Sequence, residues 1–257
     1  MSDVHAAAQR GYCCAADVYQ RGRPDYPDAV RGWLSDTLAL VAGSTAVDLA
    51  AGTGKFTRLL RDTGARVVAV EPVAGMLAQL RESLPDVLAL AGTAQNLPLR
   101  RGAAEAVTCA QAFHWFAGIH ALEEIHRVLK PSGKLALVWN VRDESVDWVA
   151  AISELMRPYE AGIPRFQSGQ WRRAFSGSLF SDLHETRFAY EHVGSAQAVI
   201  IDRVLSVSFI AALPDAQKQQ VAGQLRALIG AHPELKGRER VAFPYQTRAY
   251  VCTRAPD

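Results

Sequence analysis

The sequence predicts an α/β protein with a seven-stranded, mostly parallel sheet, an antiparallel terminal strand and helices on both faces. Short apolar runs alternate with amphipathic segments between residues 45 and 140, as in parallel strands joined by helices. One of these runs leads directly into a glycine turn and a helix. Residues 185–193 and 241–253 alternate between apolar and polar side chains, which is the pattern of half-buried strands.

An extended arm and one helix precede the sheet. Pro24 and Pro27 exclude a regular helix over residues 19–27 and favour an extended path. Residues 28–40 follow as an amphipathic helix that Pro27 opens.

Residues 45–62 are predicted as a buried strand, a tight turn and a helix. Asp48 stands near the end of the strand, and Gly52, Thr53 and Gly54 form the turn. This arrangement points backbone N–H groups and the positive end of a helix at a ligand. Glycine is favoured there because a side chain would hold the ligand away from the backbone.

The spacing of this turn argues against two kinds of ligand site. The sequence does not match the phosphate-binding P-loop pattern, because Leu49 occupies the position of the first glycine and Phe56 occupies the position of the Ser or Thr. A dinucleotide fingerprint needs a third glycine where the chain has Thr57, so it survives only as a degraded match. The next strand ends in Glu71, whose carboxylate can accept hydrogen bonds from both ribose hydroxyls of an adenosine ligand.

The same alternation places the remaining elements. Pro72 opens a helix that carries Met76 in its first turn. Strands are predicted at 87–90, 104–110 and 135–140, helices at 73–84, 119–129 and 195–229 (broken at Leu213 and Pro214), and irregular helix at 143–181.

A polar and aromatic cluster follows the strand at 104–110. It contains Gln111, His114 and Trp115, beside Phe113 and Phe116, which are expected in the core. Ligands of doubly wound sheets lie beyond the carboxyl ends of the strands, so the cluster is expected to line a reaction site. His114 stands out because its second ring nitrogen needs a polar partner.

Two stretches resemble motifs of the class I S-adenosylmethionine-dependent methyltransferases. Val-Asp-Leu-Ala-Ala-Gly-Thr-Gly at 47–54 resembles their first motif, with Ala50 where the first glycine would be, and Arg-Val-Leu-Lys-Pro-Ser-Gly-Lys-Leu at 127–135 closely resembles their third. The chain is similar to the UbiE-like and trans-aconitate methyltransferase branches, the latter through Phe-His-Trp at 113–115. The resemblance implies a Rossmann-like fold with a helical lid, S-adenosylmethionine as cofactor, and in-line methyl transfer to oxygen, nitrogen or a carboxyl group of a small organic acceptor.

The resemblance also implies a set of cofactor-binding residues. The arm would lie across the methionine end of the cofactor, so that Tyr19 and Arg23 meet its carboxylate or the substrate. Met76 would pack on adenine or belong to the core, and the backbone of Ala94 would contact adenine although Thr93 and Gln95 replace two acids of the family pattern. The full set is Arg23, Asp48, Ala50, Gly52, Thr53, Gly54, Glu71, Pro72, Met76, Thr93, Ala94, Gln95 and Gln111.

The catalytic candidates are His114, Trp115, Tyr19 and Asn140. A sulfonium methyl is already activated, so the enzyme contributes mainly positioning and desolvation. His114 would act as a base toward a hydroxyl or amine, whereas a carboxylate needs no base and would be oriented by His114 or Arg23. Asn140 either holds a polar group of the substrate or simply ends its strand, and the same holds for Arg142.

Composition narrows the partners and the location. A formal net charge of +2 over 257 residues gives no basic footprint for nucleic acid, and no apolar stretch is long enough to span a membrane. Four cysteines without paired spacing are expected to be reduced, which predicts a cytoplasmic protein without a metal site. We expect a monomer or homodimer with one domain over 1–257: an arm (1–27), a cofactor-binding core (28–142), lid elements (143–181 and 195–230) and terminal strands (182–194 and 241–254).

Two other functions fit parts of the pattern. A non-catalytic protein that keeps S-adenosylmethionine or S-adenosylhomocysteine as a structural ligand would also need Gly52, Gly54 and Glu71. A nicotinamide-dependent oxidoreductase would need the missing third glycine and a proton-donating pair.

Overall fold

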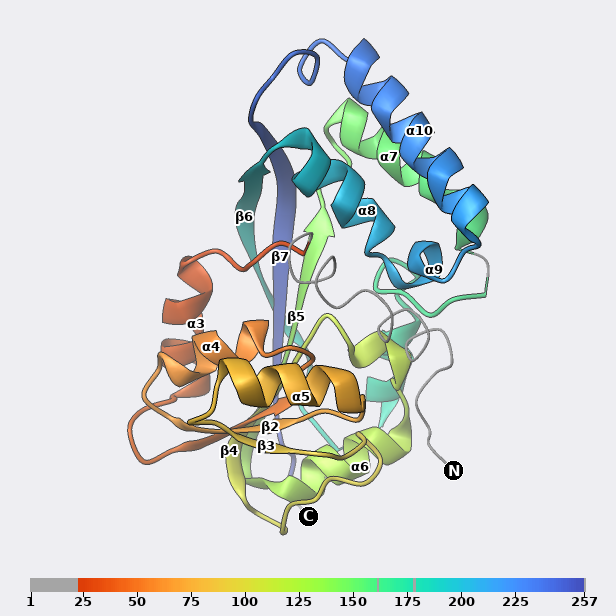
Figure 1. The fold of residues 1–257 in the computed structure, drawn as a ribbon. Helices are drawn as coiled ribbons and strands as arrows, with labels where there is room; N and C mark the ends of the chain where they lie inside the picture. The colour runs from red at the N-terminus through yellow and green to blue at the C-terminus, as the bar shows by residue number, and fades with distance from the viewer. Residues whose placement is uncertain (1–22, 161, 178, 257) are drawn as a thin grey trace.

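Seven strands form one sheet in the order β3-β2-β1-β4-β5-β7-β6 (Figure 1). The structure is a computed structural model that describes residues 23–160, 162–177 and 179–256. Neighbouring strands from β3 to β5 are parallel, and β7 is antiparallel to both of its neighbours. The strands are β1 (Thr45–Leu49), β2 (Arg66–Val70), β3 (Leu88–Leu90), β4 (Ala104–Ala110), β5 (Leu129–Arg142), β6 (His184–Gly194) and β7 (Val241–Thr253). The predicted fold class is therefore confirmed.

The strand order reverses between β1 and β4. From β1 the chain builds outward to β2 and β3, and it then returns to the other side of β1 to add β4 and β5. The crevice beyond the carboxyl ends of the strands at such a switch point is where open α/β sheets bind ligands. The topology thus directs attention to the residues just after β1 and β4.

Helices cover both faces of the sheet because successive side chains of each strand point to opposite faces. Ala46 of β1 joins a core cluster with α3 (Ala29–Leu38), α4 (Lys55–Arg61) and α5 (Ala74–Ser83). Val47 joins a second cluster on the other face, which α6 (Ile119–Val128) and the 3₁₀ helix η3 (Gln170–Ser176) complete.

A third apolar cluster lies at the far end of the long strands (Figure 1). The strands β5, β6 and β7 are 14, 11 and 13 residues long, whereas β1 has 5. Their extra length supports a separate helical layer. Its members are α7 (Asp147–Met156), η2 (Arg157–Tyr159), η4 (Gln197–Asp202), α8 (Arg203–Leu205), α9 (Ser208–Ala211) and α10 (Asp215–Ala231).

Two predicted elements differ from the observed ones. The single helix expected ahead of Pro214 is wrong, because the chain breaks again at Val207, whose backbone is extended. The strand expected from residue 135 begins at Leu129 instead. The predicted turn survives inside it as an irregularity, where the partner of β4 jumps from Leu129 to Lys134.

Candidate active site

The turn after β1 combines three residues with left-handed backbone. Ala50, Gly52 and Gly54 have φ angles of 56°, 58° and 88°. A Cβ on Gly52 would meet nothing closer than the sulfur of Met76, at 3.9 Å, so this side of the turn is open. A Cβ on Gly54 would come within 2.9 Å of Leu84, which follows the last residue of α5, and within 3.2 Å of Leu80 in α5. Gly54 is therefore required by its φ angle and by packing on α5, and not by access of a ligand.

Glu71 connects this turn to the end of β2. Its side chain is buried, and its two carboxylate oxygens accept hydrogen bonds from the backbone N–H groups of Gly52 and Val73, each at 2.8 Å. Burial raises the pKa of Glu71, and the two N–H donors oppose this effect. Each carboxylate oxygen keeps further acceptor capacity for ribose hydroxyls.

Asp48 is a second buried carboxyl group, at the end of β1. The hydroxyl of Thr57 donates a hydrogen bond of 2.6 Å to its Oδ2. Burial, with a smaller contribution from the charge of Glu71, raises the pKa of Asp48 to about 7, although the hydrogen bond from the hydroxyl of Thr57 opposes the rise. Asp48 therefore titrates near neutral pH.

The arm ahead of α3 lies against the turn. The ammonium group of Lys55 donates to the backbone oxygen of Arg23 at 2.6 Å and pairs with Asp25 at 3.2 Å. The ring of Tyr26 packs edge-on against Phe56, with the ring centres 5.0 Å apart. Asn140 donates from Nδ2 to the backbone oxygen of Asp25 at 2.8 Å.

These elements enclose a first cavity, which we call the turn pocket. It lies beyond the carboxyl ends of β1, β4 and β5, as the topology requires. Six of the predicted cofactor-binding residues line it, together with the catalytic candidate Asn140. The lining includes Arg23, Tyr26, Asp48, Ala50, Gly52, Thr53, Lys55, Phe56, Gln111, Asn140 and Arg203.

A second cavity, which we call the arginine pocket, adjoins the first. The two pockets share Arg23, Gln111, Asn140 and Arg203. The arginine pocket adds the catalytic candidates His114 and Trp115, and a wall of aromatic rings from β5 and the helical layer. Its charged and aromatic lining consists of Arg23, Arg142, Arg165, Arg203, Glu160, His114, Trp115, Trp139, Phe166 and Phe209.

The protonation of His114 follows from its contact with Trp139. The indole Nε1–H of Trp139 donates to Nδ1 of His114 at 3.2 Å. An indole nitrogen is only a donor, so Nδ1 is unprotonated and Nε2 of the neutral ring carries the proton. Burial, together with the charges of Arg23 and Arg165, lowers the pKa of His114 to about 3. His114 therefore presents a hydrogen-bond donor and is a poor base.

The remaining predicted cofactor residues do not line either pocket. Met76 is buried beside Gly52, and Pro72 lies in the sequence between Glu71 and Val73, whose N–H group donates to Glu71. Ala94 is buried in the second core cluster, and Thr93 pairs with Asn96 in the loop after β3. Gly54, Glu71 and Gln95 are also absent from both linings.

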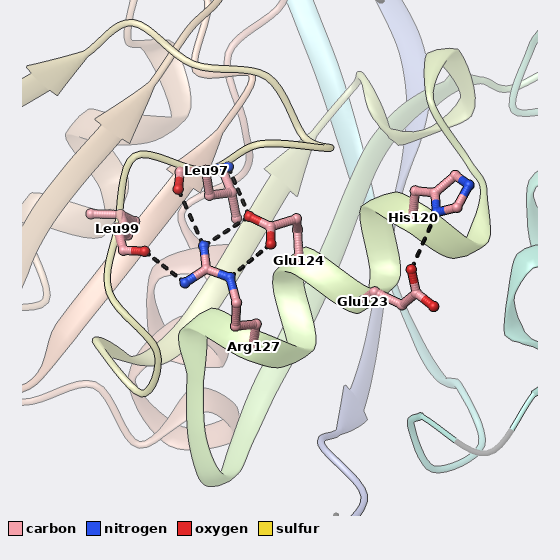
Figure 2. A network of polar contacts seen from close by, with 6 residues as sticks. All are labelled: Leu97, Leu99, His120, Glu123, Glu124 and Arg127. Carbon is pink, nitrogen blue, oxygen red and sulfur yellow. Dashed lines mark hydrogen bonds and ion pairs between the residues drawn. The ribbon is translucent and has the colours of Figure 1, made fainter.

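Two residues of α6 hold the loop after β3 (Figure 2). Glu124 accepts the backbone N–H of Leu97 at 3.0 Å. Arg127 donates to the backbone oxygens of Leu99 and Leu97 at 2.8 and 3.2 Å, and it pairs with Glu124 at 2.7 Å. The side chains of α6 thus hold the segment that follows Ala94 through both its backbone N–H and its backbone carbonyl groups.

Several residues of the pockets were not predicted as site residues. Lys55 follows the glycine turn directly but carries no side-chain signal of its own, and Glu160, Arg165 and Arg203 lie in segments without a motif. Tyr19, predicted to meet the cofactor or substrate, lies outside the described residues. In the described part of the chain no helix has the length and apolar character of a membrane span.

Comparison with known proteins finds consistent likenesses. Residues 47–137 match the family model described as a methyltransferase domain. The chain is 35% identical to an uncharacterised methyltransferase-like protein of Schizosaccharomyces pombe over 239 residues, which is 93% of both chains. It is 37% identical to an uncharacterised methyltransferase of Mycobacterium tuberculosis over 241 residues, covering 94% of this chain and 93% of the relative. A solved structure from Anaeromyxobacter dehalogenans, of a candidate type II methyltransferase, shares the fold: the TM-score is 0.62 at 21% identity, over 90% of this chain and 96% of the other.

Proposed function

The chain belongs to the family of S-adenosylmethionine-dependent methyltransferases, and we propose that it transfers the methyl group to a small organic acceptor held in the arginine pocket. One observation supports this proposal above the others. Two adjoining pockets lie at the switch point of the sheet and share Gln111 and Asn140, so a donor in one would face an acceptor in the other. Two concave pockets of this kind suit a small molecule better than a nucleic acid.

The turn pocket and the residues beside it offer groups that fit the cofactor. Glu71 retains acceptor capacity for ribose hydroxyls, and Gly52 leaves its side of the turn open. Arg23 and Lys55 supply positive charge for a carboxylate, and Arg23 can bond both carboxylate oxygens through its fork. We propose that the adenine end of the cofactor contacts Met76, Pro72 and the loop of Thr93, Ala94 and Gln95. These residues would lie on the side of the turn where Glu71 binds Gly52.

The chain's own residues would act mainly by positioning. S-adenosylmethionine supplies, when bound, a methyl group activated by a sulfonium charge. Gln111 and Asn140 lie where the two pockets meet, and His114 would donate its Nε2–H to the acceptor. The rings of Trp115 and Trp139 would exclude water from the reacting atoms.

The finer assignments extend this proposal. We propose that residues 1–257 form one domain, that the protein acts as a monomer or homodimer without nucleic acid, and that it is cytoplasmic. The buried thiols of Cys109 and Cys252 are free, which supports a reducing location.

A labelled-methyl experiment tests the proposal. Full-length protein with S-adenosylmethionine carrying a labelled methyl group is incubated with a pool of small metabolites, and we expect S-adenosylhomocysteine and a labelled product by mass spectrometry. Glu71→Ala should weaken cofactor binding by about 1–3 kcal/mol, because it leaves the ribose hydroxyls without their acceptor. Glu82→Ala, on the exposed side of α5, is the matched control. Tight cofactor binding without any turnover, or unchanged affinity in Glu71→Ala, would contradict the proposal.

A further inference from the structure

We propose that the acceptor carries a phosphate monoester, and that Arg142 and Arg203 bind this phosphate group while another atom of the same molecule receives the methyl group. This inference rests on the proposed methyl transfer and names the class of its acceptor. It depends on the balance of charge in the arginine pocket and on guanidinium donors there that lack an acceptor.

The charges in the arginine pocket are strongly unbalanced. Its described lining contains four arginines, from the arm, the end of β5, the loop after η2, and α8, but one carboxylate, Glu160. Glu160 is bound in an ion pair with Arg165. Neither Arg142 nor Arg203 forms an ion pair with a carboxylate among the described residues. A chain with a net charge of only +2 thus concentrates positive charge in one cavity.

The charge that remains in the pocket matches a dianion. Arg23 also lines the turn pocket, where we place the carboxylate of the cofactor, and Glu160 neutralises Arg165. The two positive charges that are left belong to Arg142 and Arg203. A phosphate monoester carries nearly two negative charges at neutral pH, because its second pKa is about 6. One phosphate group would therefore neutralise both guanidinium groups, whereas one carboxylate would neutralise only half of their charge.

The two arginines also have hydrogen-bond donors without a good acceptor. The Nε and Nη1 atoms of Arg203 are buried and make no hydrogen bond within the described structure. Nη1 of Arg142 contacts the thioether sulfur of Met156, which is a weak acceptor. Leaving charged donors buried without partners is costly. The three terminal oxygens of a phosphate group can accept hydrogen bonds from both guanidinium groups at once.

The electrostatic behaviour of the two arginines agrees with this geometry. Burial, together with the charges of Arg23 and Arg142, lowers the pKa of Arg203 to about 10, although Tyr245 opposes the shift. Burial likewise lowers the pKa of Arg142. Arg142 and Arg203 therefore lie within each other's electric field, in the lining of one pocket. A dianion between the two guanidinium groups would relieve their repulsion, and the guanidinium fork matches the oxygens of a phosphate group.

The phosphate group anchors the acceptor and is not its reacting group. Arg142 lines the arginine pocket but not the turn pocket, whereas Gln111 and Asn140 line both. A phosphate group that contacts Arg142 therefore leaves the position beside Gln111 and Asn140 to another part of the molecule. That part meets the methyl group of the donor, and the phosphate group keeps all of its bonds.

Small phosphate esters test the site without any turnover. Full-length protein with bound S-adenosylhomocysteine is titrated at pH 8, by calorimetry, with methyl phosphate (a dianion), with dimethyl phosphate (a monoanion of similar shape) and with malonate. We expect the Kd of methyl phosphate to be at least 20-fold below that of each of the other two. Equal affinity for the two phosphate esters, or tighter binding of malonate, would overturn the assignment of a phosphate dianion.

Variants test the residues. Arg142→Gln and Arg203→Gln should each raise the Kd of methyl phosphate at least 20-fold. In Arg142→Gln the affinity for S-adenosylhomocysteine should change less than twofold, because Arg142 does not line the turn pocket. Arg203→Lys keeps the charge and should recover part of the loss, which a folding defect would not. Arg226→Gln, on the exposed face of α10, is the control. Equal losses in Arg203→Gln and Arg226→Gln would overturn the inference.

Phosphatase treatment tests the acceptor itself. The labelled-methyl assay is run on a metabolite pool treated with alkaline phosphatase, which is removed before the assay, and on the same pool treated with heat-inactivated phosphatase. We expect at least 10-fold less labelled product from the first pool, and a product from the second that is a phosphate ester methylated away from its phosphate group. An unchanged yield, or a methyl group on a phosphate oxygen, would overturn the inference.

The outcomes separate this inference from the proposed function. If both pools give the same labelled product in equal yield, the methyltransferase function stands and the phosphate assignment fails. If methyl phosphate binds in that case, the arginines hold a free phosphate ion and not a group of the acceptor. If the protein does not bind S-adenosylmethionine, the proposed function itself fails.

Discussion

At the scale of single residues, two positions near the turn adopt states that their residue types disfavour. Ala50 has the left-handed backbone that usually belongs to glycine. Asp48 is a carboxyl group with 1% exposure, next to another buried carboxyl group, Glu71. Both features lie on or beside the turn pocket, where strain and raised pKa values commonly accompany function.

Ala50→Gly is expected to stabilise the free protein. The left-handed conformation costs alanine about 1–2 kcal/mol, whereas glycine adopts it freely but loses about 0.5–1 kcal/mol more entropy on folding. The net gain should be about 0.5–1 kcal/mol in the free energy of unfolding, measured with urea. Ala51→Gly, next to it and without a positive φ angle, should lose stability. Equal losses of stability in the two variants would contradict the idea that the backbone of Ala50 is strained.

Asp48→Asn should change how stability depends on pH. The carboxyl pKa is near 3.8 when unfolded and about 7 when folded, so between these values the folded state keeps a proton that the unfolded state has lost. The free energy of unfolding therefore falls as pH rises from about 4 to 7, by at most about 4 kcal/mol. The amide cannot ionise, so the variant's advantage over the wild type should be larger at pH 8 than at pH 4.5.

Urea unfolding of both proteins at these two pH values measures the effect. Because the pKa of Glu71 is raised as well, the informative quantity is the difference between variant and wild type. The exposed Asp86→Asn serves as the control. A difference that does not change with pH would show that Asp48 titrates normally.

At the scale of elements, side chains from helices and strands hold two irregular segments of the candidate site. Lys55 of α4 and Asn140 of β5 bind the backbone of the arm at Arg23 and Asp25. Glu124 and Arg127 of α6 hold the loop after β3 in the same way (Figure 2). In both cases a regular element positions a segment whose own backbone pairs with no strand.

Arg127→Ala is expected to weaken cofactor binding indirectly, through the loop after β3 that Arg127 holds. The loop after β3 loses two backbone contacts and becomes less ordered, so S-adenosylhomocysteine affinity should fall about 5- to 10-fold, or about 1–1.4 kcal/mol. Calorimetry measures the affinity. His120→Ala removes an exposed pair with Glu123 on the same helix and is the matched control (Figure 2). Equal effects of the two variants would argue against a positioning role.

At the scale of the whole molecule, the site lies where two layers of the structure meet. The short strands β1 and β4 provide the turn pocket, and the long strands β5 to β7 extend beyond them to support the helical layer that carries Arg203. The two pockets share residues from the arm, β5 and α8. A ligand in the turn pocket therefore contacts both layers, and binding should stabilise the molecule as a unit.

S-adenosylhomocysteine should raise the melting temperature of the whole chain. At a concentration 100 times its Kd a ligand adds about 2.7 kcal/mol, which corresponds to about 5–10 °C for a chain of this size. Differential scanning fluorimetry measures the shift. NADH at the same concentration should leave the melting temperature unchanged, and a larger shift with NADH would favour an oxidoreductase.

The sequence alone determined the order of the elements, the turn after β1 and the class of ligand. These features depend on local patterns: apolar periodicity, glycine and proline positions, and a carboxylate at the end of a strand. The sequence also placed Gln111, His114 and Asn140 at the edge of the sheet where the pockets lie, because the carboxyl ends of parallel strands meet at one edge.

Only the tertiary structure decided what these residues can do. The tautomer of His114 depends on Trp139 in another strand, and the pKa of Asp48 depends on burial and on Glu71. The unbalanced charge of the arginine pocket comes from four separate segments, two of which carry no motif. Burial, hydrogen-bond partners and electric fields are set by residues that are distant in the chain, and no local pattern records them.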